Sequence, residues 1–207
     1  MDCMSNLERF LNDQPERTPV LIKAALAHVQ FETIHPFLDG NGRLGRLLIT
    51  LLLCSEKALQ EPLLYLSLYF KRNRDEYYDL LNRVRTEGIW LEWLRFFLIG
   101  VHDTAQKAVD TAKKIQEQFK EDLDKVEKLD LRTTTTLRIL QLLQRHPIIN
   151  IPTAASQLDV SAPTVRKAVE TLEKLRILRE ITGKKRDRIY AYDRYVKILN
   201  EGTEPIR

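Results

Sequence analysis

Apolar residues recur at intervals of three and four along most of the first hundred residues. This spacing gathers them on one face of a helix, and Pro15 and Pro19 mark a break between the first two such segments. We expect helices at residues 7–11, 20–33, 47–54, 63–70, 75–86 and 90–101. Because almost no alternating strand pattern interrupts them, residues 1–102 are predicted to form an all-helical domain.

The segment 103–129 is charged, with apolar residues at near-heptad spacing. They are Ala105, Val109, Ala112, Ile115, Phe119, Leu123 and Val126. The pattern predicts one extended helix that carries a narrow apolar stripe. We expect residues 103–130 to form a connecting helix packed on the helical core, and packing against a second copy in a homodimer is the alternative.

From residue 131 onward the pattern changes to short helices and strands. The expected elements are helices at 137–144, 153–158 and 161–176 and extended segments at 147–151, 177–182 and 188–192. Thr153 is the expected cap of its helix, and Gly183 lies in the turn between the last two strands. Three helices and a basic hairpin resemble a winged helix. The expected fold class is therefore mainly α, an all-helical core followed by a small α+β winged-helix domain over residues 131–207.

The winged-helix resemblance implies how this domain would meet duplex DNA. Its second helix would be the recognition helix that enters the major groove, and the hairpin would lie along the backbone. The implied DNA-binding residues are Ser161, Thr164, Arg166 and Lys167 at the helix start and Lys184, Lys185 and Arg186 at the wing tip. Because many winged helices bind proteins or serve as scaffold, an interaction module is the alternative.

Charge is distributed unevenly along the chain. The formal net charge is +4, but residues 161–190 carry nine Lys or Arg against four Asp or Glu, a local charge of +5. The remainder is therefore near neutral. This asymmetry points to an anionic partner for the C-terminal part, while a solvated helix face is the other interpretation.

Composition excludes several classes of protein. The chain has 207 residues, of which 43% are hydrophobic, which suits one or two domains with ample cores. No apolar run approaches the roughly 18 residues that span a bilayer, so no membrane partner is expected. The first residues show no secretory signal, and Cys3 and Cys54 lack metal-ligand neighbours at zinc spacing. We therefore expect a cytoplasmic protein without zinc.

The residues from His35 to Arg46 concentrate candidate chemistry. In twelve residues they combine a base that titrates near neutral pH, a carboxylate, a Gly-Asn-Gly turn and two arginines three positions apart. An apolar run follows at once and predicts a buried helix. A helix N-terminus with successive backbone N–H groups suits a phosphate, and Asp39 could hold Mg²⁺ beside it. The stretch predicts a binding site for a phosphorylated ligand.

The stretch HPFLDGNGRLGR resembles the Fic family signature, HPFx(D/E)GNGRxxR, at every specified position. The flanking residues 24–32 and 69–78 resemble the family too, so the resemblance covers residues 7 to 101. Most Fic proteins transfer AMP from ATP to a hydroxyl side chain of a protein target. The resemblance thus implies a protein adenylyltransferase that uses ATP and Mg²⁺ and acts on a Ser, Thr or Tyr hydroxyl, in a target or in the chain itself.

The resemblance also implies residue roles. His35 would be the catalytic base, and Asp39 would hold Mg²⁺. The implied nucleotide-binding residues are Asp39, Gly40, Asn41, Gly42, Arg43, Leu44, Gly45, Arg46, Tyr77 and Tyr78. The Asn41 side chain would add a donor to the backbone N–H groups, and Arg43 and Arg46 would bind the distal phosphates. Core packing is the alternative for at least one of the two tyrosines.

Two features of the family are missing from the expected pattern. The residues before His35 read as helix and turn, so we expect no β-hairpin flap there. No Ser/Thr-x-x-x-Glu-Gly/Asn inhibitory motif occurs, since Glu87-Gly88 and Glu201-Gly202 lack the hydroxyl residue. Two alternatives to AMP transfer stay open. One is a winged-helix DNA-binding regulator whose Fic domain only senses nucleotide, and the other is transfer of a different nucleotide.

Overall fold

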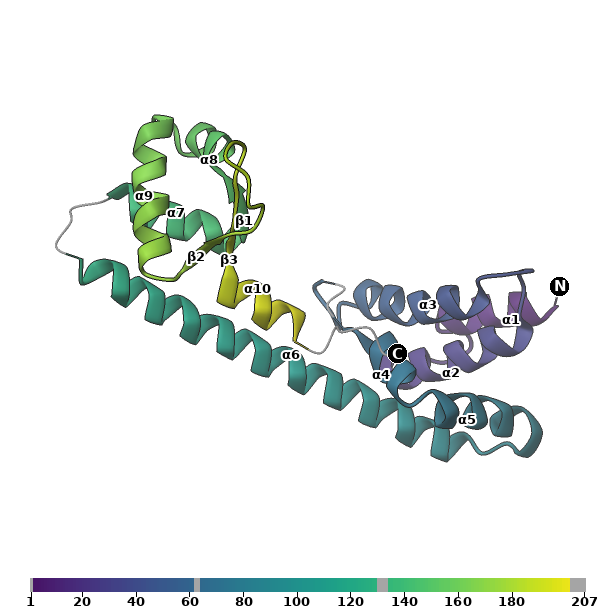
Figure 1. The fold of residues 1–207 in the computed structure, drawn as a ribbon. Helices are drawn as coiled ribbons and strands as arrows, with labels where there is room; N and C mark the ends of the chain where they lie inside the picture. The colour runs from purple at the N-terminus through teal and green to yellow at the C-terminus, as the bar shows by residue number, and fades with distance from the viewer. Residues whose placement is uncertain (1, 62–63, 130–133, 202–207) are drawn as a thin grey trace. The chain divides into compact units, whose positions relative to one another are not determined.

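The computed structural model describes residues 2–61, 64–129 and 134–201 (Figure 1). It is mainly helical with one small sheet, which confirms the expected fold class. The chain divides into two compact units, residues 1–108 and 109–205, and the division falls inside one long helix. Each unit has its own hydrophobic core.

The N-terminal unit is built only from helices in its described residues. They are α1 (Asp2–Leu11), α2 (Val20–Ile34), α3 (Asn41–Ser55), α4 (Leu66–Arg72), α5 (Arg74–Glu87) and the beginning of α6 (Trp90–Glu127). Aromatic rings fill its core, where Phe70 stacks on Tyr77 at 4.7 Å between centroids and Trp93 is fully buried. The Trp93 indole N–H donates to the carbonyl of Ala25 at 3.0 Å, which ties α6 to α2. The periodicity therefore predicted α1 to α5 and the beginning of α6, although several of their boundaries differ from the expected ones.

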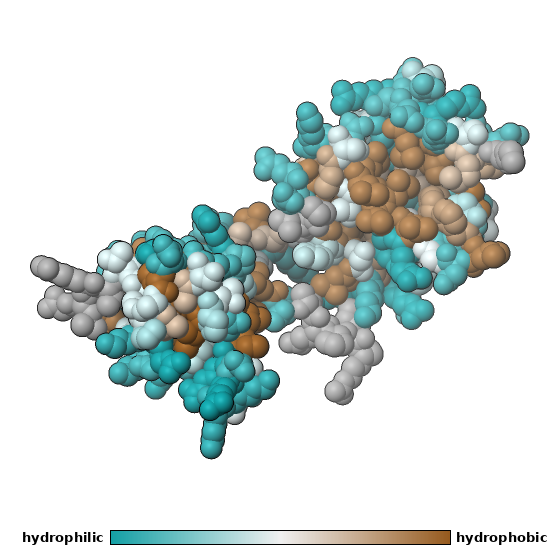
Figure 2. All heavy atoms as spheres, turned by 90° about the horizontal axis from the view of Figure 1, so that it is seen from above, coloured by the Kyte–Doolittle hydropathy of each residue, from teal (hydrophilic) through white to brown (hydrophobic). Residues whose placement is uncertain are grey.

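Helix α3 buries only part of its surface. Gly45, Ile49, Leu52 and Leu53 lie inside, whereas Leu44, Leu47 and Leu51 are 40–57% exposed. Figure 2 shows apolar surface on the N-terminal unit within a surround of hydrophilic side chains. The helix that carries the His35–Arg46 chemistry is therefore anchored from one side only.

The segments 90–101 and 103–129 form one continuous helix, α6, and not the two that the sequence predicted. Gly100 lies inside α6 without ending it. A Cβ at Gly100 would lie 2.5 Å from the ring of Tyr69, so the glycine admits this ring against the helix. A packing requirement explains this glycine, which would otherwise indicate a break.

The C-terminal unit combines helices with a three-stranded antiparallel sheet. Its elements are the end of α6, α7 (Thr134–Arg145), β1 (Ile148–Asn150), α8 (Ile151–Leu158), α9 (Ala162–Lys174), β2 (Leu178–Glu180), β3 (Ile189–Tyr192) and α10 (Asp193–Asn200). The strand order is β1-β3-β2, with Ile149 opposite Tyr190 and Arg179 opposite Ala191. The hairpin and the three helices of the predicted winged helix are present. The cap of α8 differs from the prediction, because Asn150 accepts from the Thr153 N–H at 2.8 Å.

The end of α6 packs into the C-terminal unit. Phe119 stacks on Tyr192 at 5.9 Å, Val126 joins the buried cluster, and the buried Asp122 accepts a 2.8 Å hydrogen bond from the Tyr192 hydroxyl. The apolar stripe of residues 103–130 was predicted to pack on the N-terminal core, whereas Phe119 and Val126 pack in the core of the C-terminal unit. The division into 1–102, 103–130 and 131–207 stays a prediction, and its second boundary lies outside the described residues.

Candidate active site

A short loop between α2 and α3 carries the motif. His35 ends α2 in the left-handed conformation (φ 50°, ψ 56°) and donates its backbone N–H to Phe31 at 3.0 Å. Gly40 precedes α3 at φ 83°, a conformation that glycine adopts without strain. The left-handed conformation of His35 is common at the C-terminal cap of a helix. Its side chain is exposed at the start of the loop.

The loop is fastened by Asn41. Its side chain accepts from the Phe37 N–H at 2.9 Å and donates to the Phe37 carbonyl at 2.6 Å, and Asn41 is 2% exposed. Both ends of the amide are therefore used on the loop backbone. The Asn41 side chain was predicted to be an additional donor to phosphate, whereas in the structure its hydrogen bonds are made to the backbone of Phe37.

The first turn of α3 leaves backbone donors for a ligand. No side chain among the described residues caps this helix, and the N–H groups of Arg43 and Leu44 both point to the Gly40 carbonyl. The Gly40 N–H already donates to Asp39 at 2.6 Å, so it is committed. The N–H groups of Asn41 and Gly42, with the positive end of the helix dipole, can face an anion.

The two motif arginines have different surroundings. Arg43 is largely exposed, and its guanidinium lies 3.6 Å from the Asp39 carboxylate. It also lies over Gly40, where a Cβ atom added to the glycine would be 3.5 Å from it. Arg46 is half-buried, and its guanidinium lies over Gly42. A Cβ atom added to Gly42 would be 3.2 Å from it. Both guanidinium groups therefore lie over the first turn of α3, one in solvent and one against the core.

Leu44 and Gly45 differ in their exposure on α3. Leu44 is 40% exposed, whereas Gly45 is buried where α3 crosses α2. A Cβ on Gly45 would collide with Oε1 of Glu32 and come within 3.2 Å of the His28 ring. Gly45 therefore serves close helix packing and does not face the ligand side of the loop.

Tyr77 and Tyr78 point to different faces of α5. Tyr77 is 2% exposed and its hydroxyl hydrogen-bonds Nε2 of His28 at 2.8 Å. Tyr78 is 54% exposed and has the Arg74 guanidinium over its ring at 5.7 Å. The alternative of core packing therefore holds for Tyr77, and Tyr78 is the one of the pair that a nucleotide could reach.

A polar cluster beneath the loop was missed from the sequence. Its members are His28, Glu32, Arg46 and Tyr77. Burial lowers the pKa of His28 to about 4, with the Gly45 backbone opposing this shift and the charge of Arg46 adding to it. Burial raises the pKa of Glu32, opposed by the charges of Arg46 and His35. The spacing of His28, Glu32 and His35 along one helix face was the available signal.

The carboxylate of Asp39 fits a magnesium ion that a nucleotide brings with it. Its side chain is 94% exposed, and its Oδ2 keeps a 3.6 Å distance from Arg43. No group of three His, Cys, Asp or Glu side chains in the described ranges could hold a metal unaided. Because Mg²⁺ is commonly held by one or two carboxylates plus phosphate oxygens and water, a single protein ligand suffices here.

One hollow on the N-terminal unit lies away from the loop between α2 and α3. It measures about 470 Å³ and is lined by Asn6, Leu7, Phe10, Leu26, Gln30 and Trp90. None of these residues belongs to the motif, and the lining offers no cation. The hollow therefore does not bear on the phosphate chemistry.

The residues expected to contact DNA are all exposed on the C-terminal unit. The hydroxyls of Ser161 and Thr164 hydrogen-bond each other at 2.8 Å at the start of α9, and Arg166 and Lys167 follow. Beneath the wing, Glu180 accepts from the N–H groups of Thr182 at 2.7 Å and Gly183 at 2.9 Å, which fixes the turn.

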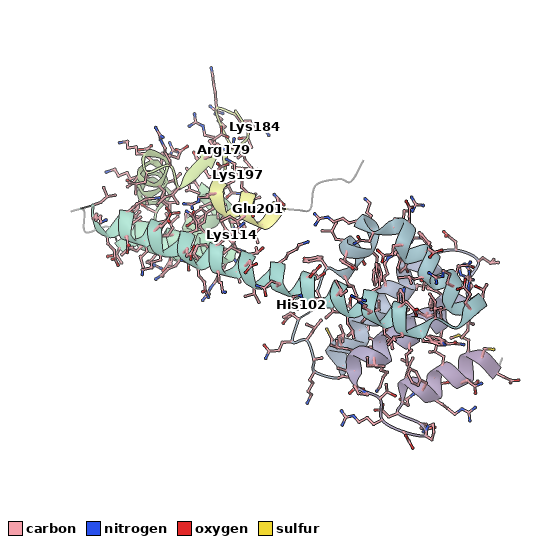
Figure 3. All side chains as sticks on the ribbon, turned by 90° about the horizontal axis from the view of Figure 1, so that it is seen from below. His102, Lys114, Arg179, Lys184, Lys197 and Glu201 are labelled. Atoms are coloured by element: carbon pink, nitrogen blue, oxygen red, sulfur yellow. The ribbon has the colours of Figure 1, made fainter. Side chains whose placement is uncertain are left out.

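The cations of the C-terminal unit fall into two groups (Figure 3). Arg179 and Lys197 both bind Asp193 at 2.7 Å, and Lys114 binds Glu201 at 2.5 Å. By contrast, no ion pair within the described part of the chain involves the wing tip, Lys184, Lys185 or Arg186. The wing-tip cations are thus available to an anionic partner.

No helix of the described residues is both long and apolar enough to cross a membrane.

Segments in both units of the chain are similar to known protein families. Residues 1–53 match the Fic/DOC family, and residues 132–179 match the winged helix-turn-helix DNA-binding family. The chain is similar to the protein adenylyltransferase Fic of Drosophila yakuba, with 38% identity over 109 residues, and of Drosophila ananassae, with 35% over 108. Each alignment covers 52% of this chain and 20% of the relative, so the chain spans about a fifth of these relatives' length.

One solved structure shares the fold. A Fic family protein from Desulfovibrio desulfuricans G20 superposes with a TM-score of 0.50 at 21% identity, over 92% of this chain and 54% of that one. The His35–Arg46 loop lies within the Fic/DOC match, and α7, β1, α8 and α9 lie within the other. Residues 1–53 are therefore similar to the Fic/DOC family, and residues 132–179 are similar to winged helix-turn-helix DNA-binding proteins.

Proposed function

We propose that the N-terminal unit transfers AMP from ATP to a hydroxyl side chain of a protein target, or of the chain itself. The observation that carries the proposal is the loop between α2 and α3. It combines an exposed histidine at the end of one helix with uncapped N–H groups and two arginines at the start of the next. The similarity of residues 1–53 to the Fic/DOC family supports the same reaction.

In this reaction the target oxygen attacks the α-phosphorus of ATP. A bond forms between that oxygen and phosphorus, the bond from the α-phosphorus to the bridging oxygen breaks, and pyrophosphate leaves. His35 would remove the proton of the attacking hydroxyl, which suits an imidazole near neutral pH. The backbone N–H groups of Asn41 and Gly42 would neutralise phosphate charge, and Arg43 and Arg46 would hold the distal phosphates.

Asp39 would hold the Mg²⁺ that accompanies ATP. When bound, that ion would offset negative charge on the phosphate oxygens. The Asp39 side chain is exposed beside the first turn of α3, and its carboxylate lies 3.6 Å from the Arg43 guanidinium. Asp39 would therefore link the cation to the loop that binds the anion.

Gly42 favours ATP in the orientation that AMP transfer requires. A Cβ atom added to Gly42 would lie 3.2 Å from Arg46 and 3.8 Å from Glu32, so little room remains for a side chain at this position. A bulky or charged residue at this position would crowd a triphosphate. Transfer of another nucleotide uses the same phosphate contacts, so the identity of the base must be measured.

Labelled nucleotides test the proposal. The full chain, supplied with Mg²⁺ and candidate target proteins, should attach label from ATP carrying it at the α-phosphate and none from ATP carrying it at the γ-phosphate. His35→Ala should lower this transfer by about 10²–10⁴-fold while ATP binding stays within a few-fold. Equal transfer by the variant would refute the role of His35. Competition by unlabelled GTP, CTP and UTP identifies the preferred nucleotide.

A second candidate function is DNA binding by the C-terminal unit, with a Fic segment that senses nucleotide. It is favoured by the match of residues 132–179 to winged helix-turn-helix DNA-binding proteins and by the exposed cations of the wing. The two candidates are compatible in one chain. A chain that binds ATP and DNA but transfers no label would favour the regulator.

A further inference from the structure

We propose that Glu180 is a positioning residue for DNA binding, because its carboxylate holds the wing turn in one conformation. The inference rests on the proposed binding of duplex DNA by the C-terminal unit. It concerns the wing tip, Lys184, Lys185 and Arg186, whose side chains are exposed. An acidic residue beneath these cations would therefore increase the affinity of the protein for a polyanion.

The sheet itself does not reach the wing tip. Its hairpin strands, β2 and β3, are last joined by the hydrogen bond from the Ile181 N–H to the Ile189 carbonyl at 3.0 Å. Beyond this bond, no backbone–backbone hydrogen bond between described residues involves residues 182–188. Lys184 lies farther out along the hairpin than Arg179 (Figure 3). The order of the wing turn therefore has to come from side chains.

Two side chains hold the turn, one at each side. Glu180, the last residue of β2, accepts from the Thr182 N–H at 2.7 Å and from the Gly183 N–H at 2.9 Å, and it also accepts from the Thr182 hydroxyl. Gly183 has a φ of 65°, which glycine adopts without strain. On the other side, the Arg188 side chain donates to the Lys184 carbonyl at 2.9 Å. Three donors at the beginning of the turn therefore end on one carboxylate.

A turn that is already ordered binds more tightly than a mobile one. A mobile wing would have to be ordered when its cations meet phosphates, and the lost backbone entropy would weaken binding. Charge alone predicts the opposite effect of Glu180, because a carboxylate near the DNA repels the phosphates. Successive backbone N–H groups can also bind an anion themselves, so without Glu180 they could accept a phosphate. The sign of the change in affinity therefore separates positioning from charge.

The test compares Glu180→Gln with Asp187→Asn in the full chain, because each removes one negative charge from the same turn. Asp187 is exposed and has a φ of 53°, a conformation that asparagine tolerates, so it is the matched control. Affinity for a duplex, measured by fluorescence anisotropy, should fall by about fivefold in Glu180→Gln, which is the cost of ordering roughly one residue. In Asp187→Asn the affinity should stay equal or rise. Because all three cations remain, the salt dependence of both variants should match that of the unaltered chain.

Equal or higher affinity of Glu180→Gln would overturn the proposal. A salt dependence flattened as much as by neutralising the three cations would also overturn it, because the substitution would then disrupt the whole wing.

A second measurement examines the turn without DNA. In the ¹⁵N-labelled chain, hydrogen exchange of the Thr182 and Gly183 amides should become faster in Glu180→Gln and stay unchanged in Asp187→Asn. Unchanged exchange in Glu180→Gln would show that the carboxylate does not hold the turn. If the unaltered chain bound no duplex even at low salt, the proposed DNA binding would fail, and the exchange measurement would still decide whether Glu180 orders the wing.

Discussion

Arg43 and Arg46 occupy equivalent places in the motif but differ in their surroundings. Arg43 is exposed, whereas Arg46 is half-buried between the first turn of α3 and the polar cluster of α2 and α5. A planar guanidinium can bind two oxygens at once, and an ammonium cannot. A lysine at position 46 would therefore lose the paired contacts that a guanidinium can make with phosphate oxygens.

Arg46→Lys should weaken ATP more than AMP. The variant keeps the positive charge but loses the paired donors that would meet the distal phosphates. We expect the ratio of the two dissociation constants to change by about five- to tenfold, measured by calorimetry with and without Mg²⁺. If both ligands weakened equally, Arg46 would not contact the distal phosphates.

His28 gives the N-terminal unit a defined pH response. The pKa of His28 is lowered by burial to about 4 from an ordinary value of 6.5. As the pH falls, the His28 ring is protonated in the unfolded chain at a higher pH than in the folded chain. The free energy of unfolding therefore keeps its full value above pH 6.5 and falls as the pH decreases toward 4. The free energy of unfolding decreases by about 3 kcal/mol over this interval.

His28→Gln should remove that part of the decline. Glutamine can still accept from the Tyr77 hydroxyl but does not titrate. Urea unfolding of both proteins at several pH values between 7.5 and 4 gives the difference, in which the contributions of other groups cancel. Parallel curves for the two proteins would show that His28 does not titrate in this interval.

Part of the site could be predicted from residues alone. The motif located the loop, the carboxylate and both arginines, because these types must occur together at fixed spacing. The motif could not show that the Asn41 amide is used on Phe37, or that Gly40 donates to Asp39. Such contacts depend on where the loop backbone turns, which the spacing of residues does not determine.

At the level of elements, periodicity predicted existence better than boundaries. Helix α3 begins at Asn41, several residues before its apolar run, because the polar motif residues form its first turns. The merger of two predicted helices into α6 and the cap at Asn150 were missed. Both depend on contacts with residues distant in sequence or on the direction of one side chain, and neither leaves a periodic signal.

The crossing of α2 and α3 depends on Gly45. Gly45→Ala should destabilise the N-terminal unit by about 1–3 kcal/mol, because crowding by the new methyl exceeds the gain in helix propensity of roughly 1 kcal/mol. The methyl would meet Glu32 Oε1 and the His28 ring. Thermal unfolding provides the measurement.

Glu32→Ala tests whether the clash with Glu32 causes the destabilisation by Gly45→Ala. In a double-mutant cycle, removing the Glu32 carboxylate should recover part of the loss caused by Gly45→Ala, since contacting residues are not additive. An additive result would place the strain elsewhere in the helix pair.

For the whole molecule, the sequence predicted two kinds of domain and the structure gives two compact units. Two local signals carried this prediction, the loop motif and the change from long helices to short helices and strands. The packing of Phe119 and Val126 into the C-terminal unit escaped the sequence analysis, because a stripe of apolar residues does not name its partner. The spacing of apolar residues shows which face of a helix is buried, but it does not show against which part of the chain that face packs.

We expect the wing to contribute to the proposed binding of the full chain to duplex DNA. The turn that carries Lys184, Lys185 and Arg186 is fixed from below by Glu180, and the Arg188 side chain donates to the Lys184 carbonyl at 2.9 Å. Three exposed cations on a fixed turn suit phosphate contacts that carry little sequence information. The wing should therefore contribute to affinity for all sequences alike.

Replacing these three residues by glutamine should lower affinity for every duplex and flatten its salt dependence. Each lost phosphate contact removes about 0.9 from the slope of log K against log salt, so the slope should fall by up to roughly 2.7. Arg9, Arg17 and Lys57, replaced together by glutamine, remove the same charge from the N-terminal unit and should leave the slope unchanged. Fluorescence anisotropy of the full chain across a salt series measures both. If the control reduced the slope as much as the wing variant, net charge and not the wing would determine binding.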